Sequence, residues 1–178
     1  MELSVFNPAD ALDNIQSFLV AGGNVLLVIM IVSFAMWLFV VERALFFAIA
    51  NGSVKKTATV GWEDRTETTS WYALAIRDKR ISIARQEAFR NMSVIKVLVA
   101  ILPLLGLLGT VTGMVEVFDV MASTGSSNAR LMAGGITKAT IPTMAGLVAS
   151  LSGILAINIL ERQASRTVAS VSDKLVIG

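Results

Sequence analysis

The stretch Val97–Val115, which reads VLVAILPLLGLLGTVTGMV, decides the fold of this chain. It carries no charged residue, and a helix of this length, at about 1.5 Å per residue, spans roughly the 30 Å hydrocarbon core of a bilayer. Gly109 and Gly113 form a G-x-x-x-G pair, a spacing that allows a second helix to approach closely. Thr110 lies beside this pair and brings a hydroxyl to membrane depth. The stretch therefore predicts a membrane span whose hydroxyl either stabilises helix packing or lines a path.

The composition of the whole chain is that of a membrane protein. Hydrophobic residues make up 54% of its 178 residues, charged residues make up 16%, and the mean hydropathy is +0.71. The absence of Cys and His excludes disulfide frameworks, Cys/His metal sites and catalysis by Cys nucleophiles or His-based triads. We therefore expect no enzyme activity, no cofactor and no metal. The net charge of +2 offers no support for nucleic-acid binding.

Three apolar runs divide the chain into seven expected segments. Gly22 and Gly23 are expected to break the helix before the first run. No Pro or Gly separates Tyr72 from Lys96, so the helix there is expected to continue unbroken into the second run. The segments are a periplasmic amphipathic interfacial helix (1–23), a first transmembrane helix (24–42), a cytoplasmic helical segment (43–96), a second transmembrane helix (97–119), a periplasmic turn (120–134), a third transmembrane helix (135–160) and a cytoplasmic tail (161–178).

The basic residues predict the orientation of the spans. Nine of the fifteen Lys and Arg residues lie between residues 43 and 90, and none precedes Arg43. Lys and Arg concentrate in cytoplasmic segments of membrane proteins. We therefore expect an all-α membrane protein with three transmembrane helices, the N-terminus outside, the C-terminus inside, and long helices extending into the cytoplasm.

Threonines in the second and third runs carry the chemistry that the spans offer. If Gly106 and Ala149 are the span midpoints, Thr110 lies about 6 Å and Thr143 about 9 Å toward the outer side, close enough to share a layer. Further threonines extend this expected polar band, namely Thr112, Thr137 and Thr140. The alternative is that each hydroxyl simply donates to a carbonyl of its own helix.

Charged and small residues complete the set of candidates. Glu116 and Lys138 lie near the expected outer ends of their helices, where interfacial placement is the alternative to a role in an entrance. No carboxylate occupies the middle of a run, so a proton carrier would come from another chain. Pro103 and Pro142 are expected to kink their helices. Close helix packing is expected at Gly106, Gly109, Gly113, Gly146 and Gly153.

Two segments, GLLGTVTGM at Gly106–Met114 and GITKATIPTMAGLVAS at Gly135–Ser150, resemble the MotA/TolQ/ExbB proton-channel family, and the ExbB branch in particular. The resemblance implies a homo-oligomeric, pentameric ring in the bacterial inner membrane. Such a ring surrounds the spans of an ExbD-like protein whose aspartate carries the proton, and a TonB-like protein delivers the energy for import across the outer membrane. Where many members carry a glutamate before the third span, this chain has Lys138.

The resemblance also implies roles for particular residues. Thr110 and Thr143 correspond to pore-lining threonines of the family. Thr112, Thr140, Glu116 and Lys138 are candidates for the pore or its outer entrance. Two other functions stay open at this stage, namely a TolQ-like subunit of an envelope-maintenance complex and a scaffold that holds partner helices without conducting ions.

Overall fold

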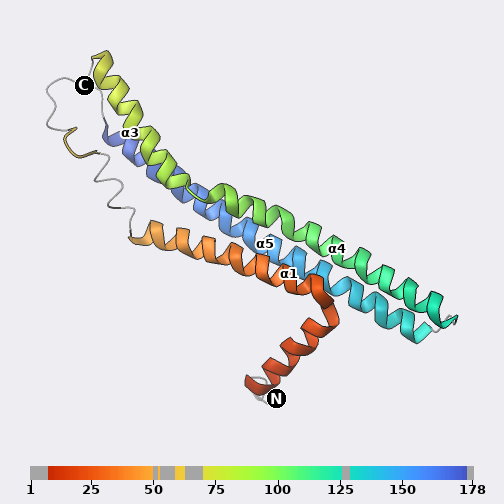
Figure 1. The fold of residues 1–178 in the computed structure, drawn as a ribbon. Helices are drawn as coiled ribbons and strands as arrows, with labels where there is room; N and C mark the ends of the chain where they lie inside the picture. The colour runs from red at the N-terminus through yellow and green to blue at the C-terminus, as the bar shows by residue number, and fades with distance from the viewer. Residues whose placement is uncertain (1–7, 50–51, 53–58, 63–69, 126–128, 176–178) are drawn as a thin grey trace. The chain divides into compact units, whose positions relative to one another are not determined.

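The computed structural model describes residues 8–49, 52, 59–62, 70–125 and 129–175, and every extended regular element among them is a helix. These helices are α1 (Pro8–Ile49), α3 (Trp71–Phe89), α4 (Met92–Thr124) and α5 (Ala129–Lys174), shown in Figure 1. Among the described residues, three stretches are long and apolar enough to cross a membrane, namely Gly22–Ile49, Trp71–Ser123 and Met132–Lys174. The expectation of an all-α chain with three candidate spans is confirmed.

The helix α1 breaks where the glycines predicted it. Gly23 has φ 65° and ψ −166°, whereas the residues on both sides are helical. A positive φ is strained for a residue with a Cβ but open to glycine. The break separates an N-terminal segment that begins at Pro8 from the first candidate span.

The expectation of an unbroken helix from Tyr72 into the second span is wrong. The helix α3 ends at Phe89 and α4 begins at Met92, and Asn91 between them has φ 61°. Asparagine adopts this left-handed conformation more readily than other residues with a Cβ. A helix can therefore end at Asn91 without Gly or Pro, the two residues whose absence led to the expectation of a continuous helix.

The helices extend further than the apolar runs. The helix α1 continues to Ile49, past the expected end of the first span at residue 42. The predicted turn at residues 120–134 is also too long, because α4 reaches Thr124 and α5 begins at Ala129. Gly125 follows α4 with φ 63°. Composition locates the apolar part of a helix, whereas backbone hydrogen bonds carry the helix on through polar residues.

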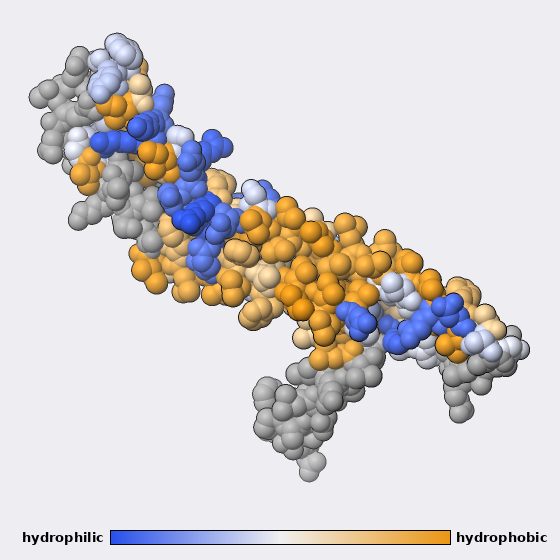
Figure 2. Space-filling model, in the orientation of Figure 1, coloured by the Kyte–Doolittle hydropathy of each residue, from blue (hydrophilic) through white to orange (hydrophobic). Residues whose placement is uncertain are grey.

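The chain divides into two compact units. The first contains residues 1–35 and 98–152, and the second contains residues 36–97 and 153–178. Figure 2 shows that hydrophobic side chains cover much of the visible face of the helices. Many large apolar side chains are exposed on the isolated chain, among them Phe34, Leu104, Met144, Val148 and Ile159. Such exposure suits helices that face lipid or other chains.

The second unit has its own small core. Trp62, Ala73, Ala84, Val171 and Leu175 form a buried cluster. Arg77 ties this cluster together, because its Nε donates to the Leu175 carbonyl at 2.9 Å and its Nη2 donates to the Ser172 hydroxyl at 3.2 Å. Residues 161–174, expected as a polar tail, are thus helical, and the end of α5 packs against α3.

Candidate functional site

The contact between α4 and α5 in the first unit is built from glycine. A Cβ added at Gly106 would lie 3.0 Å from Thr143 Cα, and one at Gly146 would lie 2.5 Å from the Leu102 carbonyl oxygen. A Cβ added at Gly113 would lie 2.7 Å from Ala139 Cβ. Real Cβ atoms essentially never approach other atoms as closely as at Gly113 and Gly146, and the contact at Gly106 is tighter than nearly all real ones, so a larger residue at any of the three would require the helices or their side chains to move.

The glycine seam, defined here as the α4–α5 contact of the first unit, includes further residues. A Cβ added at Gly109 would collide with Pro142, and one added at Gly135 would collide with Val117. Four of the five glycines expected to pack helices therefore lie in the seam, and Gly153 is buried in the second unit. Gly135 was not among the glycines expected to pack helices, although its spacing of four residues from Ala139 is a usable signal.

Two side chains of α5 donate hydrogen bonds across the seam. The Thr143 hydroxyl donates to the Gly106 carbonyl at 2.7 Å, and the Ser150 hydroxyl donates to the Val99 carbonyl at 3.1 Å. Ser150 was not among the expected site residues. Interhelical bonds of this kind add direction to contacts between small residues in a membrane.

The hydroxyls of Thr143 and Thr110 bond to adjacent carbonyls of α4. Thr143 donates to the Gly106 carbonyl and Thr110 donates to the Leu107 carbonyl, and successive residues of a helix differ by about 1.5 Å along its axis. The two hydroxyls therefore lie at similar heights along α4. Their shared depth in a membrane stays a prediction.

The hydroxyls of the other candidate threonines donate to carbonyls of their own helices, which was the alternative to a shared polar band. Thr110 donates to the Leu107 carbonyl at 2.6 Å, and Thr140 donates to the Thr137 carbonyl at 2.9 Å. Thr112 and Thr137 also donate to carbonyls of their own helices. Each hydroxyl has thus used its single proton, but its oxygen can still accept a hydrogen bond.

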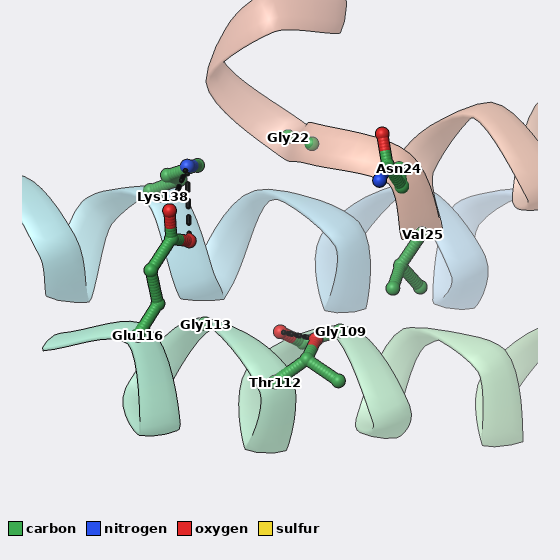
Figure 3. A pocket seen from close by; sticks show the side chains of 9 residues that line it. Gly22, Asn24, Val25, Gly109, Thr112, Gly113, Glu116 and Lys138 are labelled. Atoms are coloured by element: carbon green, nitrogen blue, oxygen red, sulfur yellow. Dashed lines mark hydrogen bonds and ion pairs between the residues drawn. The ribbon is translucent and has the colours of Figure 1, made fainter. Parts of the chain in front are cut away.

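A cavity of about 340 Å³ opens in the first unit, where the seam meets the break in α1 (Figure 3). This cavity, called the outer pocket after the side on which the sequence predicts it, is lined by Gly22, Gly23, Asn24 and Val25 of α1, by Gly109, Thr112, Gly113 and Glu116 of α4, and by Lys138 of α5. A cavity of this volume has room for several water molecules.

An ion pair forms one wall of the outer pocket. The Lys138 Nζ atom lies 3.0 Å from each carboxylate oxygen of Glu116, and Figure 3 shows the two side chains pointing toward one another. Their side chains remain 40% and 60% exposed. A Cβ added at Gly23 would lie 3.8 Å from Lys138 Cε, which places the lysine directly beside the break.

The structure thus gathers three of the four candidate entrance residues. Thr112, Glu116 and Lys138 all line the outer pocket, whereas Thr140 does not. The pocket combines a carboxylate, an ammonium group and a hydroxyl, all of which can hydrogen-bond to water. The contribution of α1 was not foreseen, although the Gly22-Gly23-Asn24 sequence predicted the break that creates it.

Comparison with known proteins finds similarity over most of the chain. A model of the MotA/TolQ/ExbB proton channel family matches residues 48–173. The biopolymer transport protein exbB1 of Vibrio cholerae is 40% identical over 74 residues, which cover 41% of this chain and 32% of that protein. The biopolymer transport protein ExbB of Salmonella typhimurium is 31% identical over 96 residues, which cover 54% and 39% respectively. The chain therefore spans well under half the length of these curated relatives.

Proposed function

Since the chain belongs to the MotA/TolQ/ExbB proton channel family, and to its ExbB branch, we propose that it is a proton-channel subunit of an energy-transducing complex. The complex is a homo-oligomeric ring in the bacterial inner membrane. An ExbD-like single-span protein supplies the proton-carrying aspartate, and a TonB-like protein transmits the energy to import across the outer membrane. The N-terminus lies outside and the C-terminus inside.

The outer pocket is the observation that carries this proposal. It places the titratable Glu116 and Lys138 together with Thr112 at one end of the glycine seam. Water held between such groups can pass protons from one hydrogen-bonding group to the next. We assign the pocket as the outer entrance for protons, with Thr110 and Thr143 further along the path.

The role of Thr143 in that path follows from its hydrogen bond. Its hydroxyl proton is committed to the Gly106 carbonyl. The Thr143 oxygen can therefore only accept a hydrogen bond from a second group. A protonated carboxylic acid of the partner chain is a donor and fits this requirement, whereas an ionised carboxylate does not.

Proton flux into vesicles tests the proposal. The full chain is reconstituted alone, with an ExbD-like subunit, and with that subunit carrying Asn in place of its membrane aspartate. We expect flux that collapses an imposed pH gradient only with the intact partner. Equal flux in all three preparations, or none in any of them, would remove the proposed function.

One observation favours a second candidate, a scaffold that holds partner helices without conducting. Thr110, Thr112, Thr137 and Thr140 donate to their own helices, which is the behaviour of threonines without a pore role. The vesicle experiment separates the two candidates. A scaffold assembles with the partner, as native mass measurement would show, and yet leaves the pH gradient intact.

A further inference from the structure

The two hydrogen bonds that cross the glycine seam have matching positions on both helices. Thr143 and Ser150 are seven residues apart on α5, and their acceptors Gly106 and Val99 are seven residues apart on α4. Seven residues make about two helical turns, so both bonds lie on the facing sides of two antiparallel helices. They therefore define a single register between α4 and α5.

The acceptor of Ser150 is a carbonyl that its own helix cannot serve. In an α-helix the carbonyl of residue 99 accepts from the N–H of residue 103. Residue 103 is proline, which has no N–H. The Val99 carbonyl thus lacks its helical donor, and Ser150 on α5 donates to it instead.

The surroundings make this replacement bond important. Ser150 is only 5% exposed, and Val99 and Leu102 beside it are also buried. No water is available in a membrane interior to satisfy an open carbonyl, so the loss of a donor there is costly. Pro103 thus leaves the Val99 carbonyl without a helical donor, and Ser150 supplies a donor from the other side of the seam.

The glycine seam needs such a hydrogen bond, because contacts between small residues alone define the register of two helices poorly. Glycine faces let two helices approach, but they have no large side chains that interlock and resist sliding. A hydrogen bond requires a short distance and a favourable angle, so it holds one alignment. Ser150 lies at one end of the seam and Thr143 lies two turns away.

We propose that Ser150 is a positioning residue of the proton path, because its bond to the carbonyl that Pro103 leaves open fixes the register at which Thr143 meets Gly106. This inference rests on the proposed function, which supplies the proton path. The register itself can be measured without reference to proton flux. In the variant Ser150→Ala, α5 loses its hydrogen bond to the Val99 carbonyl, and the position of the Thr143 oxygen relative to the partner chain becomes variable.

A disulfide provides the measurement of register, since the chain has no cysteine of its own. A Cβ added at Gly135 would lie 3.3 Å from Val117 Cβ, just below the separation of about 3.5–4.5 Å found in disulfides. The pair Val117→Cys and Gly135→Cys is introduced into the full chain in its complex with an ExbD-like subunit. The rate of disulfide formation then reports the alignment of α4 and α5, and proton flux is measured on the same preparations before oxidation.

We expect Ser150→Ala to lower both the disulfide rate and the flux by about fivefold, the effect of one hydrogen bond of ordinary net strength. The second change Pro103→Ala gives the Val99 carbonyl a donor within α4 but restores no bond between the helices, so the disulfide rate and the flux should stay lowered in the double variant. Ser152→Ala is the matched control, since Ser152 donates to the Ala149 carbonyl of its own helix at 2.7 Å and should change neither rate.

The outcomes separate the two claims. A disulfide rate in Ser150→Ala equal to that of the parent overturns the positioning role. So does a double variant that recovers the parent's disulfide rate, since the open carbonyl and not the register would then account for the loss. A parent complex that forms the disulfide normally but conducts no protons overturns the proposed function instead. A normal disulfide rate with reduced flux would place Ser150 in the path directly and thereby overturn its role through register.

Discussion

Arg43 of α1 donates a hydrogen bond from Nη2 to the main-chain carbonyl of Glu87, in the last turn of α3. Glu87 lies four residues before Asn91, so in an unbroken helix its carbonyl would accept from the Asn91 N–H. The neighbouring Glu42 accepts a bond from the Asn91 side-chain amide at 3.3 Å. Two adjacent residues of α1, Glu42 and Arg43, thus form hydrogen bonds with residues at the break between α3 and α4.

Arg43→Ala should destabilise the second unit strongly. Arg43 is 1% exposed, and its guanidinium carbon lies 4.2 Å from the centre of the Phe46 ring. Its removal leaves an open carbonyl and a cavity, which together should cost about 2–4 kcal/mol of unfolding free energy. Unfolding of the full chain in detergent, followed by circular dichroism, measures the loss. The exposed Arg162→Ala is the control and should change stability by less than about 0.5 kcal/mol, and an equal effect of both variants would contradict the role of Arg43.

Asn91→Ala and Asn91→Gly should differ, because the φ of 61° at this residue is strained for alanine but not for glycine. Both variants lose the bond to Glu42. Alanine should cost about 1–2 kcal/mol more than glycine through the left-handed conformation. The comparison of the two unfolding midpoints isolates this term. If alanine is tolerated as well as glycine, α3 and α4 can join into a continuous helix in the folded protein.

Gly113→Ala should disrupt the glycine seam. The added methyl group would lie 2.7 Å from Ala139 Cβ, so the helices must separate, at a cost of about 1–3 kcal/mol. Gly134→Ala is the matched control, because nothing lies within 4 Å of a Cβ at that position. Alanine there should be neutral or should stabilise the helix by up to about 1 kcal/mol. Thermal unfolding of the two variants tests the contrast, and equal midpoints would show that the seam can relax around a methyl group.

Lys138→Glu should impair proton flux, because two carboxylates would then face one another in the outer pocket. The reversed pair Glu116→Lys with Lys138→Glu should restore flux, since it re-forms the ion pair with the charges exchanged. The exposed pair contributes less than about 1 kcal/mol to stability. Flux measured at equal amounts of assembled complex separates the effect on the entrance from any effect on folding. Normal flux in Lys138→Glu would exclude the pocket as the entrance.

Thr143→Val should lower proton-driven transport and leave assembly intact. Valine keeps the shape of the side chain but removes the oxygen that we assign to the path. The Gly106 carbonyl can still accept from the N–H of Thr110, its ordinary helical partner, so the folding penalty should stay near about 1 kcal/mol. Native mass measurement checks assembly, and uptake or vesicle flux checks function. Unchanged transport would remove Thr143 from the site.

The candidate site was only partly accessible from the sequence. The motifs identified Thr143, Glu116 and Lys138 as candidates, and the structure brings the last two together in the outer pocket. Ser150 was not predicted as a site residue because its partner is a main-chain carbonyl, which no residue type encodes. Pro103 does indicate the acceptor, since a proline in a helix leaves open the carbonyl four residues before it, which here is that of Val99.

The sequence by itself determined the three apolar runs, the break at Gly23, the small residues of the seam and the family, because hydropathy, backbone freedom and side-chain size are local properties of residues. Tertiary structure decided the register of α5 against α4, and with it the pairing of Thr143 with Gly106 and of Ser150 with Val99. It also decided the closing of the pocket against the break in α1. Register depends on which carbonyl meets which hydroxyl when two helices pack. The stretch Val97–Val115 specifies a surface that a second helix can approach. Only the packed structure specifies the register at which that second helix lies against it.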